Sequence, residues 1–190
     1  AIDCDITDAA AVDSLFEQIE TELGRLDVLF NNAGNNVAHA PIGDVPPEDF
    51  LTVINVNLKG YFNYNKAAAM VFKDCKGGKI VNISSINGMR GKFAQSNYAA
   101  SKGGEIALSK SLARELGKFN VNVNVVSPGL VMTDMARNMP PEALNKSTSE
   151  TVVGRIATPD ECADLVVFLC SDRARHITGE VIKIDGGQYI

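Results

Sequence analysis

The stretch that decides the fold runs from Lys79 to Gly129. It opens with KIVNISS (79–85) and closes with VNVNVVSPG (121–129), two short runs rich in β-branched residues that stop at serines or at Ser-Pro-Gly. Between them, the pattern from about Ser96 to Leu116 is that of a helix. Strands separated by such a helix can lie side by side only in parallel, through a crossover. The stretch therefore predicts part of a parallel α/β sheet.

The same alternation continues on both sides of that stretch. Toward the N-terminus, a helix pattern over 7–24 precedes a strand at 26–30, and Pro47 opens a further helix. Toward the C-terminus, Thr158–Glu161 has the form of a capping box, and Glu180–Ile184 reads as a last strand. Strands alternating with helices predict an α/β fold whose ligands bind beyond the carboxyl ends of the strands.

Composition excludes several classes of protein. The chain has 190 residues, of which 45% are apolar and 22% charged, with a formal net charge of −5. This is typical of a globular protein and not of a disordered one. The mild acidity argues against a nucleic-acid surface, and the longest apolar runs, Ala67–Phe72 and Leu165–Cys170, are too short to cross a membrane. We therefore expect a cytoplasmic protein without nucleic-acid or membrane partners.

The cysteines do not predict a metal site. Cys4, Cys75, Cys162 and Cys170 stand alone, without a Cys-x-x-Cys pair. We expect buried, reduced thiols that behave as small apolar side chains.

A tyrosine and a lysine carry the chemistry that the sequence suggests. Tyr98 and Lys102 lie four residues apart at the start of a helix, so their side chains project from one face. An ammonium beside a phenol favours the phenolate and lowers the pKa of the tyrosine. Ser85, at the end of a strand, could hold a substrate oxygen against the Tyr98 hydroxyl. Asn57, among apolar neighbours in the preceding helix, could bind a water that leads to Lys102.

Each of these residues also has a structural interpretation. A helical tyrosine near a lysine, taken alone, is usually a packed ring beside a solvated charge. Ser85 could simply end its strand, and the Asn31–Gly34 segment could be an ordinary turn. His39 could line the mouth of a site or lie on the surface. The combination of motifs decides between the two interpretations.

Five short motifs resemble, in order and spacing, those of the short-chain dehydrogenase/reductase family. They are Asn31-Asn32-Ala33-Gly34, Asn55-Val56-Asn57-Leu58, Val81-Asn82-Ile83-Ser84-Ser85, Tyr98-x-x-x-Lys102 and Pro128-Gly129. The resemblance covers residues 1–190 as a single domain. It implies a Rossmann-like, doubly wound parallel sheet and hydride transfer between NAD(H) or NADP(H) and a carbonyl or alcohol carbon.

The resemblance assigns roles to the catalytic candidates. Tyr98 would give a proton to the carbonyl in reduction and take one in oxidation. Lys102 would lower the pKa of Tyr98 and bind the nicotinamide ribose. Ser85 would orient the carbonyl, and Asn57 would hold the water of a proton relay.

The resemblance also assigns cofactor contacts. Asp5 and Ile6 match the pair that contacts the adenine in the family. Asn32, Ala33 and Gly34 match the backbone under the adenosine ribose. The residues that match the segment at the nicotinamide carboxamide are Pro128, Gly129, Val131 and Thr133. The choice between NAD and NADP depends on earlier strands in this family, so both cofactors stay open.

One part of the family pattern has no counterpart. The family begins with a strand and a glycine-rich turn that holds the pyrophosphate at a helix N-terminus, whereas the sixteen glycines here never fall in a Gly-x-Gly spacing. The position of Asp5 predicts that about 50 residues, a first β-α-β-α portion, precede this sequence. The alternative expectation is a molecule that binds dinucleotides poorly.

Within the family, the sequence is most similar to bacterial 3-oxoacyl-(acyl-carrier-protein) reductases. Gln95–Lys102, Lys110–Glu115 and Gly186–Ile190 carry this similarity. We expect an acyl-thioester or small-molecule substrate, with acyl carrier protein as a candidate partner. An acidic carrier needs a basic rim, and Lys76 and Lys118 supply only a thin one.

Two alternatives stay open. One is a dehydrogenase of another alcohol or ketone, such as a sugar, hydroxy acid, cyclic alcohol or steroid. The other is a non-catalytic homologue that binds a nucleotide or a partner. The family further implies a homotetramer, assembled through the helix from Pro47, the helix with Tyr98 and the C-terminal tail.

Overall fold

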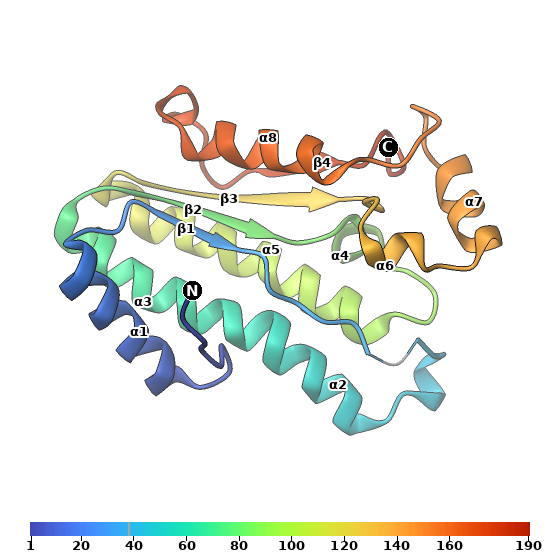
Figure 1. The fold of residues 1–190 in the computed structure, drawn as a ribbon, viewed down its shortest axis with the longest axis horizontal. Coiled ribbons are helices and arrows are strands. Elements are labelled where there is room, and N and C mark those ends of the chain that lie inside the picture. Colours follow the sequence, from blue (N-terminus) through green and yellow to red (C-terminus); the bar gives the residue numbers. More distant parts are fainter. Residues whose placement is uncertain (38) are drawn as a thin grey trace.

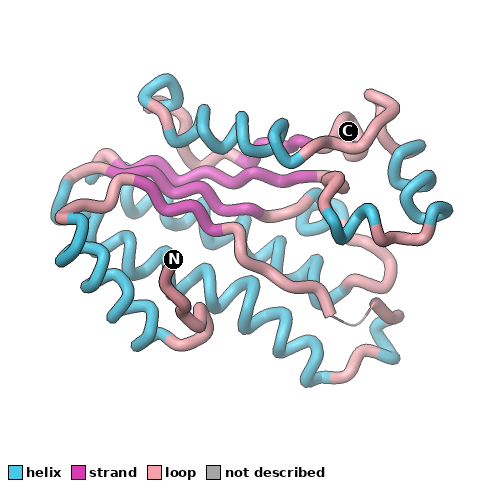
Figure 2. Tube along the Cα trace, viewed as in Figure 1, coloured by secondary structure: helices cyan, strands magenta, loops and turns pink. Residues whose placement is uncertain are grey.

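The computed structural model describes residues 1–37 and 39–190. Within these ranges, a sheet of four parallel strands in the order β1-β2-β3-β4 forms the centre of the molecule. Figure 1 draws the strands as arrows, and Figure 2 shows them side by side as magenta segments. They are β1 (Val28–Asn31), β2 (Gly78–Ile83), β3 (Val121–Pro128) and β4 (Val181–Ile184). The parallel α/β fold expected from the alternation of elements is confirmed.

Helices cover both faces of the sheet, as a doubly wound fold requires (Figure 1). One face carries α1 (Ala9–Leu23), α3 (Gly60–Cys75) and α5 (Ser96–Leu116). The other face carries α8 (Pro159–Cys170). The short helices beyond the carboxyl ends of the strands are α4 (Ile86–Arg90), α6 (Asp134–Arg137) and α7 (Pro141–Ser149).

The helix that begins at Pro47 is longer than its apolar pattern indicates. It starts as α2 (Pro47–Val53), passes through a π-helical turn at Ile54–Lys59, and continues into α3. A π-helical turn carries an extra residue and is frequently found at functional sites. Here it contains Asn57, one of the catalytic candidates.

The core lies on both sides of β3, the strand whose residues are the most buried. Val121 and Val123 face the cluster under α1, α3 and α5, and Val126 faces the cluster under α8. The alternating Asn122 and Asn124 are structural, because their side-chain amides donate to the backbone carbonyls of Arg175 and Ile177. A strand buried on both faces is typical of the interior of a parallel sheet.

The predicted start and stop signals of the helices are confirmed. Asp8 caps α1 by accepting hydrogen bonds from the N–H groups of Ala10 and Ala11, and Gly24 ends the helix in the left-handed conformation at φ 73°. Thr158 and Glu161 form a complete capping box at the start of α8. These caps satisfy N–H groups that have no partner inside the helix.

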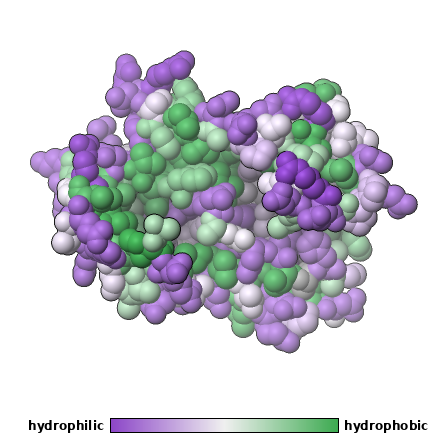
Figure 3. Space-filling view, in the orientation of Figure 1, coloured by the Kyte–Doolittle hydropathy of each residue, from purple (hydrophilic) through white to green (hydrophobic). Residues whose placement is uncertain are grey.

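The strand β1 leaves apolar side chains at the surface. Val28 and Phe30 are 37% and 46% exposed, and Figure 3 shows apolar groups gathered over this part of the sheet.

In the described ranges, no helix is long and apolar enough to cross a bilayer. The expectation of buried thiols is wrong for Cys75, which is exposed near the end of α3, while the other three free cysteines are half-buried.

Candidate active site

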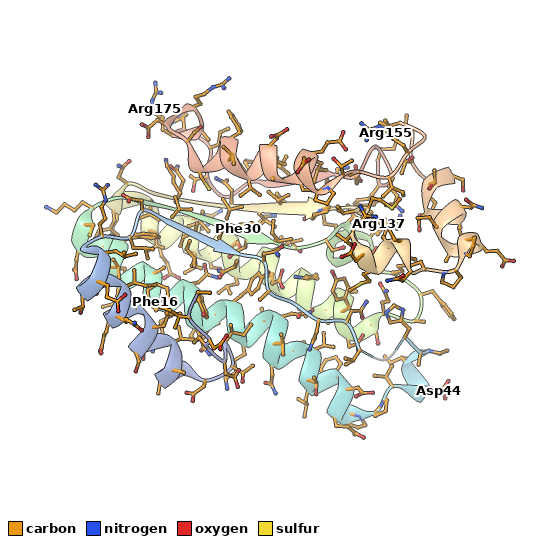
Figure 4. All side chains as sticks on the ribbon, viewed as in Figure 1. Phe16, Phe30, Asp44, Arg137, Arg155 and Arg175 are labelled. Atoms are coloured by element: carbon orange, nitrogen blue, oxygen red, sulfur yellow. The ribbon has the colours of Figure 1, made fainter. Side chains whose placement is uncertain are left out.

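The predicted catalytic residues meet where the parallel strands end. Asn31 is the last residue of β1, Ser85 follows β2, and Pro128 ends β3. Because neighbouring parallel strands end at the same edge of a sheet, the loops that follow them share one surface. Figure 4 shows Arg137 and Arg155 at this end of the molecule and Arg175 at the opposite end.

Tyr98 and Lys102 project from the first turns of α5 and lie close together, as their spacing predicts. The Lys102 ammonium nitrogen lies 5.8 Å from the centre of the Tyr98 ring and 5.1 Å from that of Tyr61. Lys102 is only 3% exposed. Its ammonium donates to the backbone carbonyl of Ile83 at 2.8 Å, which ties α5 to the end of β2.

Ser85, in the loop between β2 and α4, contributes the second hydroxyl of the site. Its hydroxyl accepts a hydrogen bond from the Asn87 N–H at 3.1 Å and so caps α4. The Ser85 side chain also lies close enough to Tyr98 to interact with its hydroxyl, and this interaction lowers the pKa of the phenol. The neighbouring Ser84 hydroxyl donates to the Lys102 carbonyl at 2.8 Å. Two hydroxyls, those of Ser85 and Tyr98, are therefore held where one substrate oxygen could contact both.

The acidity of Tyr98 differs from the prediction. Burial raises its pKa to about 12, the charge of Glu105 adds to the increase, and the interaction with Ser85 partly opposes it. The predicted net decrease of the Tyr98 pKa is wrong for this structure, because burial and the charge of Glu105, which lies against the Lys102 ammonium, raise it. Tyr98 is therefore protonated at neutral pH, which is the state that a proton donor needs.

Asn57 anchors the loop that follows β1. Its amide nitrogen donates to the carbonyl of Asn35 at 2.9 Å and to the Ser101 hydroxyl at 3.1 Å, and its oxygen accepts from the Asn35 N–H at 2.8 Å. A methyl group on Gly34 would lie 3.3 Å from the Asn57 oxygen and 3.6 Å from the Lys102 ammonium. The loop 32–35 therefore runs directly past the catalytic candidates. The water that Asn57 is predicted to hold stays a prediction.

Three of the predicted cofactor residues share one pocket. A pocket of about 130 Å³ is lined by Ile6, Asn32 and Ala33, together with Tyr61 and Gly60. The pocket wall is fixed, because the Asn63 amide donates to the Ile6 carbonyl at 2.9 Å. Asp5 is exposed next to this pocket and its carboxylate accepts hydrogen bonds from the N–H and hydroxyl of Thr7.

The other predicted cofactor segment follows β3. The Gly129 N–H donates to the Ile184 carbonyl at 3.1 Å. A methyl group on Gly129 would come within 3.1 Å of the Asp185 backbone, so this position needs glycine. Val131 pairs with Ala157 in a single bridge, and the exposed Thr133 precedes α6.

Three buried side-chain oxygens in these loops have no hydrogen-bond partner within the described part of the chain. They are Asn35 Oδ1, Asn36 Oδ1 and Ser127 Oγ. Buried polar atoms in proteins are nearly always paired. Their position on the loops after β1 and at the end of β3 fits a polar ligand that supplies the missing partners.

Sequence reasoning missed Glu105 and Tyr61. Glu105 is three residues beyond Lys102, so the helical spacing alone places it on the same face. Tyr61 donates from its hydroxyl to the Asn31 carbonyl at 3.0 Å and lies beneath the Lys102 ammonium. Its spacing gives no comparable signal, because its place depends on how α3 packs on β1.

Comparison with known proteins agrees with this geometry. A family model described as enoyl-(acyl carrier protein) reductase matches residues 1–188. The chain belongs to the short-chain dehydrogenase/reductase family, whose members are oxidoreductases.

Similar curated proteins carry more particular names. The chain is 40% identical over 185 residues to the 3-oxoacyl-(acyl-carrier-protein) reductase of Thermotoga maritima, covering 97% of this chain and 75% of the relative. It is 42% identical over 173 residues to the acetoacetyl-CoA reductase of Shinella zoogloeoides, covering 90% and 71%. It is 41% identical over 186 residues to the 3-oxoacyl-(acyl-carrier-protein) reductase of Mycobacterium tuberculosis, covering 98% and 75%.

Proposed function

We propose that this protein reduces the ketone of a 3-oxoacyl thioester to a secondary alcohol with NADPH or NADH. The observation that carries the proposal is the meeting of the Ser85 and Tyr98 hydroxyls beside Lys102 at the ends of the strands. The names of the similar reductases support the class of substrate, because acetoacetyl-CoA is itself a 3-oxoacyl thioester.

The chain's own residues handle the proton and the developing charge. A bound NADH or NADPH would supply the hydride to the carbonyl carbon. Tyr98 is protonated at neutral pH and donates its proton to the carbonyl oxygen. The Ser85 hydroxyl holds that oxygen in place as negative charge develops. The Lys102 ammonium, 5.8 Å from the ring centre, stabilises the phenolate that remains.

Residues on the same edge of the sheet would hold the cofactor. We assign the adenosine end to Asp5, Ile6, Asn32, Ala33 and Gly34, since the shared pocket brings three of these together. We assign the nicotinamide end to the segment that begins at the last residue of β3. Its residues are Pro128, Gly129, Val131 and Thr133. Lys102 and Tyr98 would contact the nicotinamide ribose between the two ends.

The carrier of the thioester is a separate question. Lys76 and Lys118 precede β2 and β3, so within one chain they lie at the end of the sheet opposite Ser85. At the catalytic end, Arg137 and Arg155 are paired with Asp134 and Glu161. The two lysines therefore lie at the wrong end for a basic rim at the active site, and the two arginines are already paired with carboxylates. Coenzyme A thioesters are the first substrates to test, and acyl-carrier-protein thioesters are the second.

The proposal also covers the state in which the protein works. We propose a cytoplasmic homotetramer in which residues 1–190 belong to one dinucleotide-binding domain that also includes an N-terminal portion before residue 1. Half-exposed apolar side chains on α2 and α3, among them Leu51, Phe62 and Met70, support self-association.

Absorbance at 340 nm tests the function. The protein is mixed with acetoacetyl-CoA and either NADPH or NADH, and the same assay is repeated with an acetoacetyl-acyl-carrier protein. Oxidation of one reduced cofactor supports the proposal and identifies the preferred cofactor. Cofactor binding without turnover of either thioester would refute the thioester assignment and favour another ketone or alcohol. No cofactor binding would refute the enzymatic proposal and favour a partner-binding homologue.

A further inference from the structure

A buried carboxylate beside the catalytic lysine has no part in the reaction described so far. Glu105 is 0% exposed, three residues beyond Lys102 on the same face of α5. Its two oxygens accept from the Lys102 ammonium at 2.8 and 3.1 Å. In the described ranges, Lys102 is the one hydrogen-bond partner of this carboxylate. Burying a carboxylate is costly unless it is paired, so the purpose of Glu105 is tied to Lys102.

The groups around Glu105 are few and well defined. The titratable side chains that face it are Tyr98 and Lys102 from α5 and Tyr61 from α3. The Tyr61 hydroxyl donates to the Asn31 carbonyl and not to Glu105. On the sheet side, Asn82 of β2 is uncharged, and its amide donates to the hydroxyl of Ser109, one helical turn beyond Glu105, at 2.8 Å.

The charge of Glu105 acts on both catalytic groups in the same direction. Burial raises the pKa of Glu105 to about 8 although Lys102 opposes this, so the carboxylate is ionised in alkaline solution. Its negative charge raises the pKa of Tyr98. Burial lowers the pKa of the Lys102 ammonium, and Glu105 counteracts that decrease. Without Glu105, a proton would leave the Tyr98–Lys102 pair more easily, whichever of the two groups releases it.

We propose that Glu105 is a positioning residue, an inference that rests on the proposed reductase function. Its carboxylate fixes the Lys102 ammonium against the end of β2 and keeps the Tyr98–Lys102 pair fully protonated in alkaline solution. Reduction needs both protons, because the phenol is the proton donor and the ammonium stabilises the phenolate. Glu105 therefore extends the active range of reduction toward high pH.

A pH profile of reduction tests this role with a matched control. Glu105→Gln keeps an oxygen that can accept from Lys102 but removes the charge. We expect the alkaline fall of kcat/KM to move down by about one pH unit or more. Glu115→Gln makes the same change at an exposed position of α5 and should leave the profile in place. A merely structural Glu105 would lower kcat/KM equally at every pH and leave the fall where it is.

A second readout does not depend on turnover. Protein labelled with 13C at tyrosine Cζ and lysine Cε reports loss of each proton by NMR, with Tyr98→Phe and Lys102→Arg to assign the signals. In Glu105→Gln, the first proton should leave Tyr98 or Lys102 at a pH lower by about one unit or more. Unchanged titration of both groups would overturn the proposal even if the parent reduces the thioester. A shifted titration in a protein without turnover would instead leave the positioning role standing and refute the proposed substrate.

A second variant, Glu105→Leu, tests the proposal if Glu105→Gln does not fold. Glu105→Leu places an apolar side chain of similar size and good helix propensity in the same buried position, and it removes the partner of Lys102 altogether. The same downward shift of the first proton is expected, and its absence would contradict the proposal in the same way.

Discussion

At the scale of single residues, the hydroxyl of Ser85 has two partners with different purposes. It caps α4 through the Asn87 N–H, and it meets the Tyr98 hydroxyl. Ser85→Ala should lower kcat for thioester reduction about 100-fold, because one donor to the developing charge is lost. The free energy of unfolding should fall by only about 1 kcal/mol, the value of a helix cap.

Steady-state kinetics and chemical denaturation measure these two effects separately. Ser111→Ala is the control, since its exposed hydroxyl on α5 donates only to the Ala107 carbonyl, and it should change neither quantity much. Retention of full kcat in Ser85→Ala would remove Ser85 from the catalytic set.

The sequence predicts which residues share a face of a helix, but it does not predict whether that face is buried. The four-residue step from Tyr98 to Lys102 fixes that both lie on one face of a helix. It does not show that the same face is buried, and burial is what raises the pKa of Tyr98. Glu105 was missed for the same reason, because a glutamate three residues from a lysine is usually a solvated surface pair.

At the scale of elements, the contact between α4 and α5 sets the position of Lys102. A methyl group on Gly88 of α4 would lie 2.6 Å from the Lys102 carbonyl carbon and 2.8 Å from the Gly103 nitrogen. Gly88→Ala should therefore push the two helices apart and destabilise the fold by about 1–3 kcal/mol. It should also lower kcat, because Lys102 moves away from Tyr98.

Thermal denaturation and the thioester assay follow both effects of Gly88→Ala. Gly117→Ala serves as the control, because nothing lies within 4 Å of a methyl group at that position. It should be neutral or slightly stabilising, since alanine loses less chain entropy than glycine on folding. Equal behaviour of the two variants would show that the α4–α5 contact does not position Lys102.

Element-level prediction succeeds where local signals decide. The strand KIVNI, the capping box at Thr158 and the glycine stop at Gly24 all form as predicted, because each depends on neighbours in sequence. The π-helical turn around Asn57 has no comparable sequence signal. The hydrogen bonds of this turn's Asn57 go to Asn35, which lies in a separate loop and is distant in sequence.

At the scale of the whole molecule, apolar side chains at the surface are the basis of the proposed self-association. Phe62 and Met70 of α3 are 50% and 58% exposed. A homotetramer that packs α3 against its mate would bury them. Phe62→Asp should therefore give a smaller species in light scattering after size-exclusion chromatography, because a charge would be buried in the interface.

Phe93→Asp is the matched control for assembly. Phe93 is 85% exposed in the loop before α5, away from α3 in sequence. Its substitution should leave the molar mass of the assembly unchanged. A parent protein that elutes as a monomer would contradict the tetramer directly.

The measurement that tests the central claim most directly is the single-turnover rate of Tyr98→Phe. The variant and the parent are each saturated with the preferred reduced cofactor, mixed with acetoacetyl-CoA and followed at 340 nm. Because both proteins are saturated with cofactor, loss of the positioned general acid should itself slow the reaction by about 100-fold to 10,000-fold. A variant that reduces the thioester at the parent's rate would contradict the assignment of Tyr98 as the proton donor.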